Sequence, residues 1–179
     1  MKYRCVPAAA ILFASLTASA QGGWIDMQGN ALPETETARS KEGFSASLVI
    51  TPDKNWQEKW ETPPEEVPHF TESKEVSDAG ELYILTFLSN PKLDPTGMTD
   101  VACDFVVSRP DGSKSVDEVD IPCFKVALTT NPQQVYLSGT WLKFLAEPAD
   151  LRGTWGVAVT VKDRVRSVEI PLKTTFLVK

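Results

Sequence analysis

The sequence is poor in the residues on which most metal and nucleophile chemistry depends. Its 179 residues include one histidine, three cysteines and three methionines. A site built from several histidine or cysteine ligands therefore has too few candidates. The composition, 42% hydrophobic and 23% charged, excludes collagen-like, coiled-coil and wholly disordered chains and indicates an ordinary globular protein.

The chain also lacks an apolar run of the roughly 20 residues that a spanning helix requires. The longest run, residues 6–16, follows Lys2 and Arg4 and precedes the small residues Ala-Ser-Ala at positions 18–20. This pattern predicts a secretory signal peptide over residues 1–20, and a retained membrane anchor is the alternative. We therefore expect a periplasmic or secreted protein with no membrane span once the signal is cleaved.

Positive charge is scarce as well. The formal net charge is −6, and cleavage of the signal removes Lys2 and Arg4, which leaves the mature chain more acidic. An acidic chain repels phosphate backbones and anionic lipid surfaces. Nucleic acid is thus excluded as an expected partner.

The mature chain keeps two cysteines, Cys103 and Cys123, because Cys5 leaves with the signal. In an oxidising compartment such a pair predicts a disulfide, and closing a loop of this length stabilises the fold by about 3 kcal/mol in the entropy model. A redox-active or metal-binding pair is the alternative. The spacing does not match Cys-x-x-Cys, and His69 is the only histidine that could join as a ligand.

The mature chain divides into a polar, turn-rich segment, residues 21–43, and a domain over residues 44–179. We expect the first to be a flexible N-terminal arm, with Trp24 and Ile25 as its only strong apolar pair. Alternating or continuous apolar patterns predict strands over residues 44–51, 81–89, 101–107, 115–121, 123–128, 135–145, 154–161 and 168–178. One short helix is expected over 53–61, followed by an acidic, proline-rich surface connection over 63–77.

Three details of the strand pattern predict where particular residues lie in the sandwich. Residues 81–89 are apolar on both alternating sets, which predicts a strand covered on both faces. Trp155 is in register with the inward valines of its strand and is expected in the core. Pro171 lacks an amide donor, so its strand should lie at a sheet edge or contain a bulge there.

About eight strands with frequent turns predict an all-β antiparallel sandwich. The stretch 150–155 (DLRGTW), followed by alternating valines, resembles the start of the penultimate strand of immunoglobulin-like domains. The last hairpin is similar to the closing strands of fibronectin III-like domains. The resemblance covers residues 81–179 and implies an immunoglobulin-like β-sandwich such as small secreted proteins of Gram-negative bacteria contain.

Two departures from the antibody pattern qualify the resemblance. Trp155 stands where those domains have a corner tyrosine. Cys103 and Cys123 are too close in sequence for the usual bridge between sheets, so we expect their disulfide to join neighbouring strands or a strand and its loop.

The sequence contains no catalytic constellation and no pattern that binds a cofactor. His69 is interpreted as a surface-loop residue, because no nucleophile turn accompanies it. Calcium is an alternative for two acidic stretches, but neither has EF-hand spacing. These stretches contain Asp94 and Asp100, and Asp117, Glu118 and Asp120. Paired carboxylates for glycoside cleavage are a further alternative that nothing in the spacing favours.

Trp56, Trp60 and Trp141 are the candidate partner-binding residues. Exposed tryptophans stack on sugar rings or anchor protein partners. The competing interpretation is that Trp56 and Trp60 anchor the short helix across an open end of the sandwich. The prediction is a non-enzymatic binding or accessory module with a protein partner in the cell envelope, contacted through these tryptophans or an open edge strand. A carbohydrate-binding module and a hydrolase with an unrecognised site are the alternatives.

Overall fold

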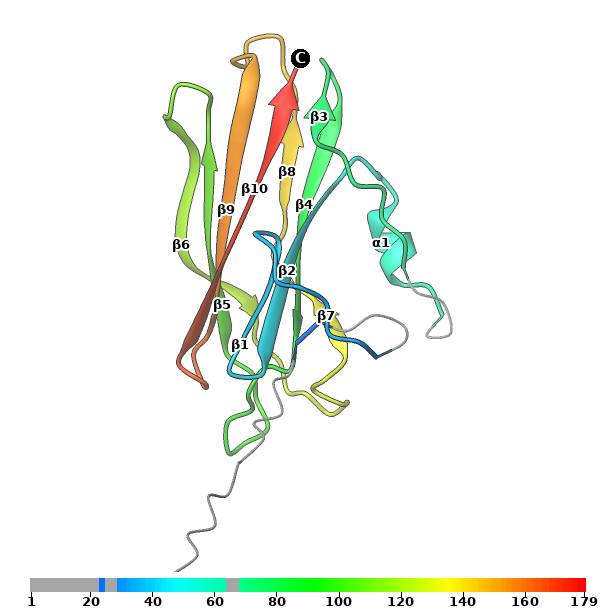
Figure 1. Ribbon diagram of the computed structural model, residues 1–179, viewed down its shortest axis with the longest axis vertical. Helices are drawn as coiled ribbons and strands as arrows, with labels where there is room; N and C mark the ends of the chain where they lie inside the picture. Colours follow the sequence, from blue (N-terminus) through cyan, green and yellow to red (C-terminus); the bar gives the residue numbers. More distant parts are fainter. Residues whose placement is uncertain (1–22, 25–28, 64–67) are drawn as a thin grey trace, which may run out of the picture.

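Alternation of apolar and polar residues along the strands produces two sheets whose apolar faces pack together (Figure 1). The computed structural model describes residues 23–24, 29–63 and 68–179. The predicted signal peptide and Ile25 lie outside these residues. The predicted all-β sandwich is confirmed, with one short helix, α1 (Trp56–Trp60).

The first sheet has the order β1-β2-β4-β7, and β8 also pairs with β4. Its strands are β1 (Ala38–Lys41), β2 (Phe44–Thr51), β4 (Glu81–Ser89), β7 (Val135–Leu137) and β8 (Leu142–Leu145). The second sheet has the order β3-β10-β9-β5-β6. Its strands are β3 (Glu75–Val76), β5 (Val101–Ser108), β6 (Lys114–Phe124), β9 (Gly153–Asp163) and β10 (Val168–Val178). All pairs are antiparallel except the two-residue parallel pair of β3 and β10.

The core lies between the sheets. Trp155 is 1% exposed, as its register with the inward valines predicted, and its ring packs against Phe144 and Phe176. The Trp155 indole donates to the Leu151 carbonyl at 2.9 Å, so its one polar atom is paired. In β10, buried and exposed residues alternate over most of the strand, which confirms one dry and one wet face.

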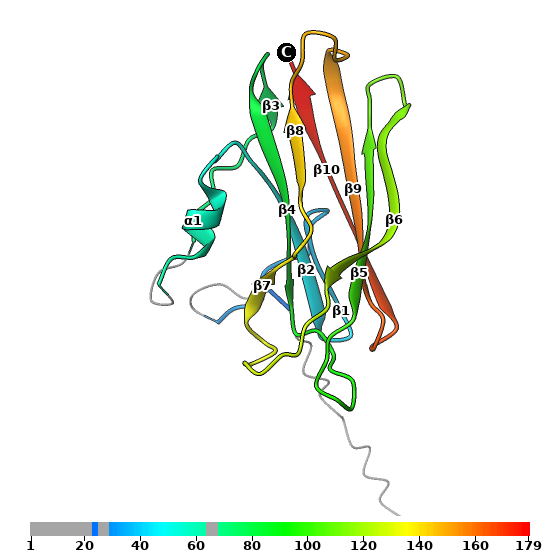
Figure 2. The ribbon, with the colours of Figure 1, turned by 180° about the vertical axis from the view of Figure 1, so that it is seen from behind.

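A second, smaller apolar cluster covers the outer face of the first sheet. Leu82, Ile84 and Leu88 of β4 point into the main core, whereas Tyr83, Leu85 and Phe87 belong to the outer cluster. This confirms the prediction that residues 81–89 are covered on both faces. Helix α1 supplies the cover and lies beside β4 and β2 outside the sandwich (Figures 1 and 2).

Buried Asp163 ties the turn ends of both sheets together. Its carboxylate accepts from the Lys92 amide and pairs with Arg166, while the Arg166 guanidinium also donates to the carbonyls of Glu42 and Asn90. The β9–β10 turn is thereby joined to the β1–β2 turn and to the loop after β4.

Several predicted boundaries are wrong. Residues 38–41, placed in the flexible arm, form β1 because they pair with β2. No separate strand covers 123–128, since β6 continues only to Phe124, and the predicted strand 135–145 is split into β7 and β8. The helix is limited to Trp56–Trp60. Pro171 lies in β10 with unbroken pairing to β9, so the edge alternative holds and the bulge does not.

Candidate partner-binding surface

The two sheets have edges formed by β1, by β7 and β8, by β6, and by β10 with β3. An unprotected edge offers free amides and carbonyls to a further strand. The side chains and neighbouring segments at each edge therefore decide where a partner strand can bind.

The β1 and β10 edges are occupied by the chain itself. At β1, the amide of Ser40 donates to the Glu34 carboxylate and the amide of Ala38 to the Thr35 hydroxyl. At β10, Pro171 has no donor, and the amide of Lys173 donates to the Glu36 carbonyl at 2.8 Å. Both edges are closed to a further strand over these residues.

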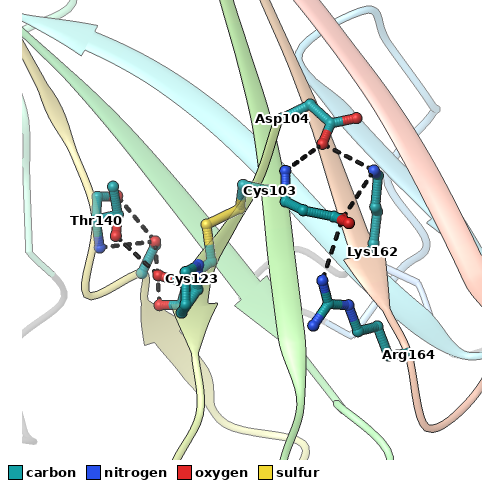
Figure 3. The surroundings of a disulfide bond; sticks show 9 residues. Cys103, Asp104, Cys123, Thr140, Lys162 and Arg164 are labelled. Atoms are coloured by element: carbon teal, nitrogen blue, oxygen red, sulfur yellow. Dashed lines mark hydrogen bonds and ion pairs between the residues drawn. A yellow bond between two sulfur atoms is a disulfide. The ribbon is translucent and has the colours of Figure 1, made fainter. Parts of the chain in front are cut away.

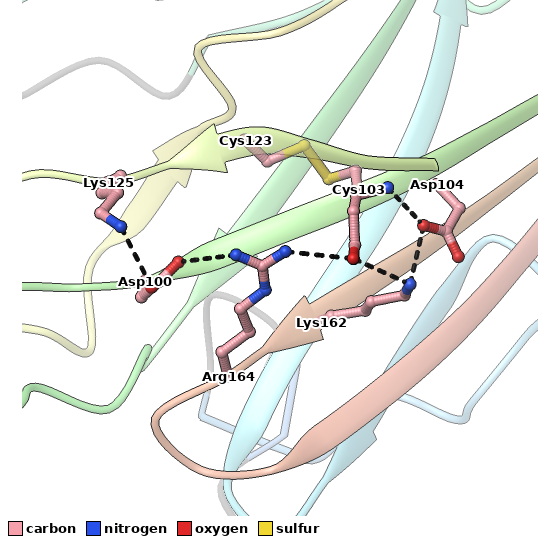
Figure 4. Close-up of polar contacts among 8 residues, drawn as sticks. Asp100, Cys103, Asp104, Cys123, Lys125, Lys162 and Arg164 are labelled. Carbon is pink, nitrogen blue, oxygen red and sulfur yellow. Dashed lines mark hydrogen bonds and ion pairs between the residues drawn. A yellow bond between two sulfur atoms is a disulfide. The ribbon is translucent and has the colours of Figure 1, made fainter. Parts of the chain in front are cut away.

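The β6 edge is protected by charge and irregularity. Its pairing with β5 has three register shifts, and Asp117, Glu118 and Asp120 are exposed along it. Asp120 bridges Lys162 and Arg164. Arg164 also pairs with Asp100 (Figure 4). Bonds from Lys162 and then Arg164 lower the pKa of Asp120, so this carboxylate stays charged. Such features disfavour strand addition.

The β8 edge is free. The Ala146 amide donates to the Gly80 carbonyl opposite it, so by antiparallel alternation Phe144 and Leu142 bond to β4 while Lys143 and Leu145 direct their amides and carbonyls outward. Within the described part of the chain, no hydrogen bond reaches these outward groups. We call this strand side the β8 edge.

Trp141 lies directly before β8 and joins the outer aromatic cluster. Its ring centroid is 5.2 Å from that of Trp56 and 6.0 Å from that of Tyr83. Trp141 is 37% exposed and Leu145 is 46% exposed. An aromatic residue that is held on one side and wet on the other is typical of an interface anchor.

A charged group borders this aromatic surface. The Glu81 carboxylate accepts from the Tyr83 hydroxyl at 2.8 Å and pairs with Lys143 at 3.0 Å and Lys54 at 3.6 Å. The Tyr83 bond and then the Lys143 bond lower the pKa of Glu81, and the Glu81 carboxylate raises the pKa of Lys143. Two ammonium groups thus share one carboxylate, so this group of three side chains carries an excess of one positive charge.

Helix α1 is fastened at its start by Asp53. Burial of this carboxyl opposes its ionisation, but hydrogen bonds from Lys59 Nζ at 2.6 Å and the Thr71 amide at 2.8 Å lower its pKa to about 2. The fastened helix holds Trp56 and Trp60 against β4, where Trp60 packs on Phe87.

The structure separates the three predicted tryptophans by exposure. Trp56 is 4% exposed and Trp60 is partly buried, so these two anchor α1, while Trp141 presents a wet face. The anchoring interpretation is therefore closer to the structure, but its position is wrong: the helix covers the outer face of the first sheet rather than an open end. Leu145 and Lys143 escaped sequence reasoning, because edge position depends on pairing.

The disulfide between Cys103 and Cys123 is present and joins the neighbouring strands β5 and β6, as expected (Figure 3). His69 is exposed in its loop. The Asp94 carboxylate accepts from its own turn at Thr96 and Met98. Over residues 23–24, 29–63 and 68–179, no three His, Cys, Asp or Glu side chains gather as a metal-ligand group, and no helix is long and apolar enough to cross a membrane.

No protein-family model matches this chain, and no curated protein matches it. Solved structures similar to it include a family 123 glycoside hydrolase from Clostridium perfringens, at 9% identity over 75% of this chain and 27% of that chain, with a TM-score of 0.44. A Niemann-Pick type C2 protein from the Japanese carpenter ant matches at 12% identity over 74% of this chain and 89% of that chain, with a TM-score of 0.37. The CARDB domain of the PF1109 protein from Pyrococcus furiosus matches at 13% identity over 82% and 97% of the two chains, with a TM-score of 0.35.

These TM-scores are all below 0.5, so the similarities assign neither a family nor an activity. The chain spans only about a quarter of the length of the glycoside hydrolase. Any function must therefore be argued from the surface itself.

Proposed function

We propose that this protein is an exported, non-enzymatic binding module that receives an extended segment of a protein partner at the β8 edge. The observation that carries the proposal is that β8 directs free backbone groups outward beside the half-exposed Trp141 and Leu145. Main-chain bonds to an added strand supply affinity, and alternate side chains supply specificity. The buried disulfide fits an oxidising compartment such as the periplasm or the extracellular space.

The side chains along β8 indicate the chemistry of the partner. Trp141, Lys143 and Leu145 alternate with residues that face the core, so an added strand places every second side chain beside them. Apolar residues fit beside Trp141 and Leu145. An acidic residue fits beside Lys143, because Glu81 neutralises only one of the two ammonium groups near it. The expected segment reads apolar, any, acidic, any, apolar.

A glycan is the second candidate. Trp141 keeps an exposed face, as a sugar platform requires, but its ring is tilted by 65° to Trp56 and 52° to Tyr83. The cluster thus offers one aromatic face rather than a common plane, which favours a peptide over an oligosaccharide.

Site-specific photocrosslinking tests the proposal in the cells that make the protein. Leu145→p-benzoylphenylalanine places the crosslinker at the β8 edge. The matched control places it at Val119 of β6, which is 63% exposed on the protected edge. We expect a discrete protein adduct from position 145 and none from position 119. Equal adducts from both positions, or none from position 145, would refute the β8 edge as the site.

A pair of synthetic peptides tests the predicted charge. One has the apolar-any-Asp-any-apolar pattern and the other has lysine in place of the aspartate. The wild-type protein should bind the aspartate peptide more tightly, and Lys143→Glu should reverse the order, as measured by calorimetry. Equal affinity of the wild-type protein for both peptides would contradict the role of Lys143, and binding of a glycan array in place of either peptide would favour the second candidate.

A further inference from the structure

The segment between β7 and β8 departs from the sheet. Leu137 pairs with Phe87 of β4 and Leu142 pairs with Ile84, so residues 138–141 lie opposite only Leu85 and Thr86. The extra length forces this segment, which we call the 138–141 link, to bulge out of the ladder. Trp141 is its last residue, and the shape of the link therefore decides where the Trp141 ring lies.

The link is held by the opposite sheet. The Gly139 amide donates to the Cys123 carbonyl at 2.7 Å, and the Thr140 hydroxyl donates to the Pro122 carbonyl at 2.9 Å. Figure 3 shows Thr140 beside Cys123. The Ser138 hydroxyl lies 3.3 Å from the same Cys123 oxygen and accepts from the Thr140 amide. These bonds join the edge of the first sheet to the end of β6.

Gly139 shows how close this approach is. A Cβ atom at this position would lie 3.4 Å from the Cys123 carbonyl oxygen. Because this is an ordinary van der Waals distance, the link is held against β6 by the Gly139 amide hydrogen bond rather than by the absence of a side chain.

The end of β6 needs support of its own. It is an edge strand, and its pairing with β5 is irregular both between Val101 and Ala102 and between Cys103 and Phe105. The Cys103–Cys123 bond joins the two strands at this irregular stretch. Both sulfurs are buried, with Cys103 at 0% and Cys123 at 2% exposure, which places the bond out of reach of solvent reductants.

We propose that the Cys103–Cys123 disulfide and the Gly139 amide position Trp141 for partner binding. The disulfide fixes the Cys123 carbonyl, this carbonyl fixes the 138–141 link, and the link sets the Trp141 ring against Trp56 and Tyr83. The positioning stands on the geometry of the free protein, and its consequence for binding rests on the proposed function.

Amide exchange measured by NMR tests the first step. In the Cys103→Ala/Cys123→Ala double variant, the Gly139 amide should lose roughly tenfold more protection than the Val159 amide in the centre of the second sheet. Ile170→Ala is the control, because it removes core packing from β10, which pairs with β3 and β9 and not with the link. It should lower the protection factors of the Gly139 and Val159 amides by the same factor. Equal losses at Gly139 and Val159 in the double variant would overturn the proposal.

A second variant tests the link with the disulfide intact, whether or not the double variant folds. Thr140→Val removes the bond to Pro122 and should shift the indole NMR signal of Trp141 while leaving that of buried Trp155 in place. An unchanged Trp141 signal would overturn the transmission step. Crosslinking from position 145 should then fall in Thr140→Val but not in Ile170→Ala. Because the exchange and indole measurements need no partner, a failure of the β8 site is distinguished from a failure of the positioning.

Discussion

Replacing Trp56 with alanine tests whether the outer cluster belongs to the cooperative fold. Trp56 is 4% exposed and contacts Tyr83 and Trp141. A tryptophan buries roughly 150–250 Å², which at about 25 cal/mol per Å² corresponds to roughly 4–6 kcal/mol as an upper bound. Trp141 is half-exposed and close enough to relax into part of the space. We therefore expect Trp56→Ala to lower the free energy of unfolding by about 3 kcal/mol, the lower end for such truncations.

Urea unfolding followed by far-ultraviolet circular dichroism measures this loss, since the strand signal does not depend on the deleted ring. Trp60→Ala is the comparison, and its partly buried ring should cost less, about 1–2 kcal/mol. The Trp141 indole signal should also change in Trp56→Ala, because its supporting ring is gone. A loss below about 1 kcal/mol with an unchanged denaturant slope would show that α1 and its cluster detach without unfolding the sandwich, which would refute the reasoning.

Two further predictions concern polar groups. The pKa of Asp53 is lowered to about 2 from an ordinary 3.8, so the ionised carboxylate stabilises the fold fully above about pH 4, and this stabilisation is lost as the pH falls toward 2. Asp53→Asn should therefore remove about 1–2 kcal/mol of pH-dependent stability between these pH values. Urea unfolding at stepped pH measures this loss. A pH dependence identical to that of the wild type would contradict this assignment. The Thr86 hydroxyl faces the core opposite Leu48 and has no hydrogen-bond partner among the described residues. Thr86→Val should therefore raise the free energy of unfolding by about 1 kcal/mol. A loss of stability would show that the hydroxyl is paired.

The local sequence pattern was sufficient to predict the bounds and the buried residues of strands that have one or two apolar faces. The strands Phe44–Thr51 and Glu81–Ser89 have the predicted bounds, and the last hairpin has the predicted inward row with Trp155 in it. The reason is physical: a period of two places one row of side chains in the core whatever the rest of the fold is. The disulfide followed from the chemistry of the expected compartment and from the number of cysteines left after removal of the predicted signal.

The features that the sequence pattern missed depend on strand pairing and on contacts between segments distant in sequence. Residues 38–41 are polar and form a strand only because β2 lies beside them. The apolar pattern of residues 135–145 continues through the 138–141 link, so its interruption became visible only through the bonds from Gly139 and Thr140 to β6. Trp56 and Trp141 have the same side chain, yet Trp56 is buried between α1 and β4 and Trp141 is partly exposed.

The sequence by itself determined the class of the fold, the core of its longest strands and the disulfide pair, because each depends on local periodicity or on residue chemistry alone. Only the tertiary structure decided which edge is open, which tryptophan meets solvent and what holds it there. These properties arise where segments 15 or more residues apart meet, such as Cys123 with Ser138 and Trp56 with Trp141, and no local pattern along the chain encodes such a contact.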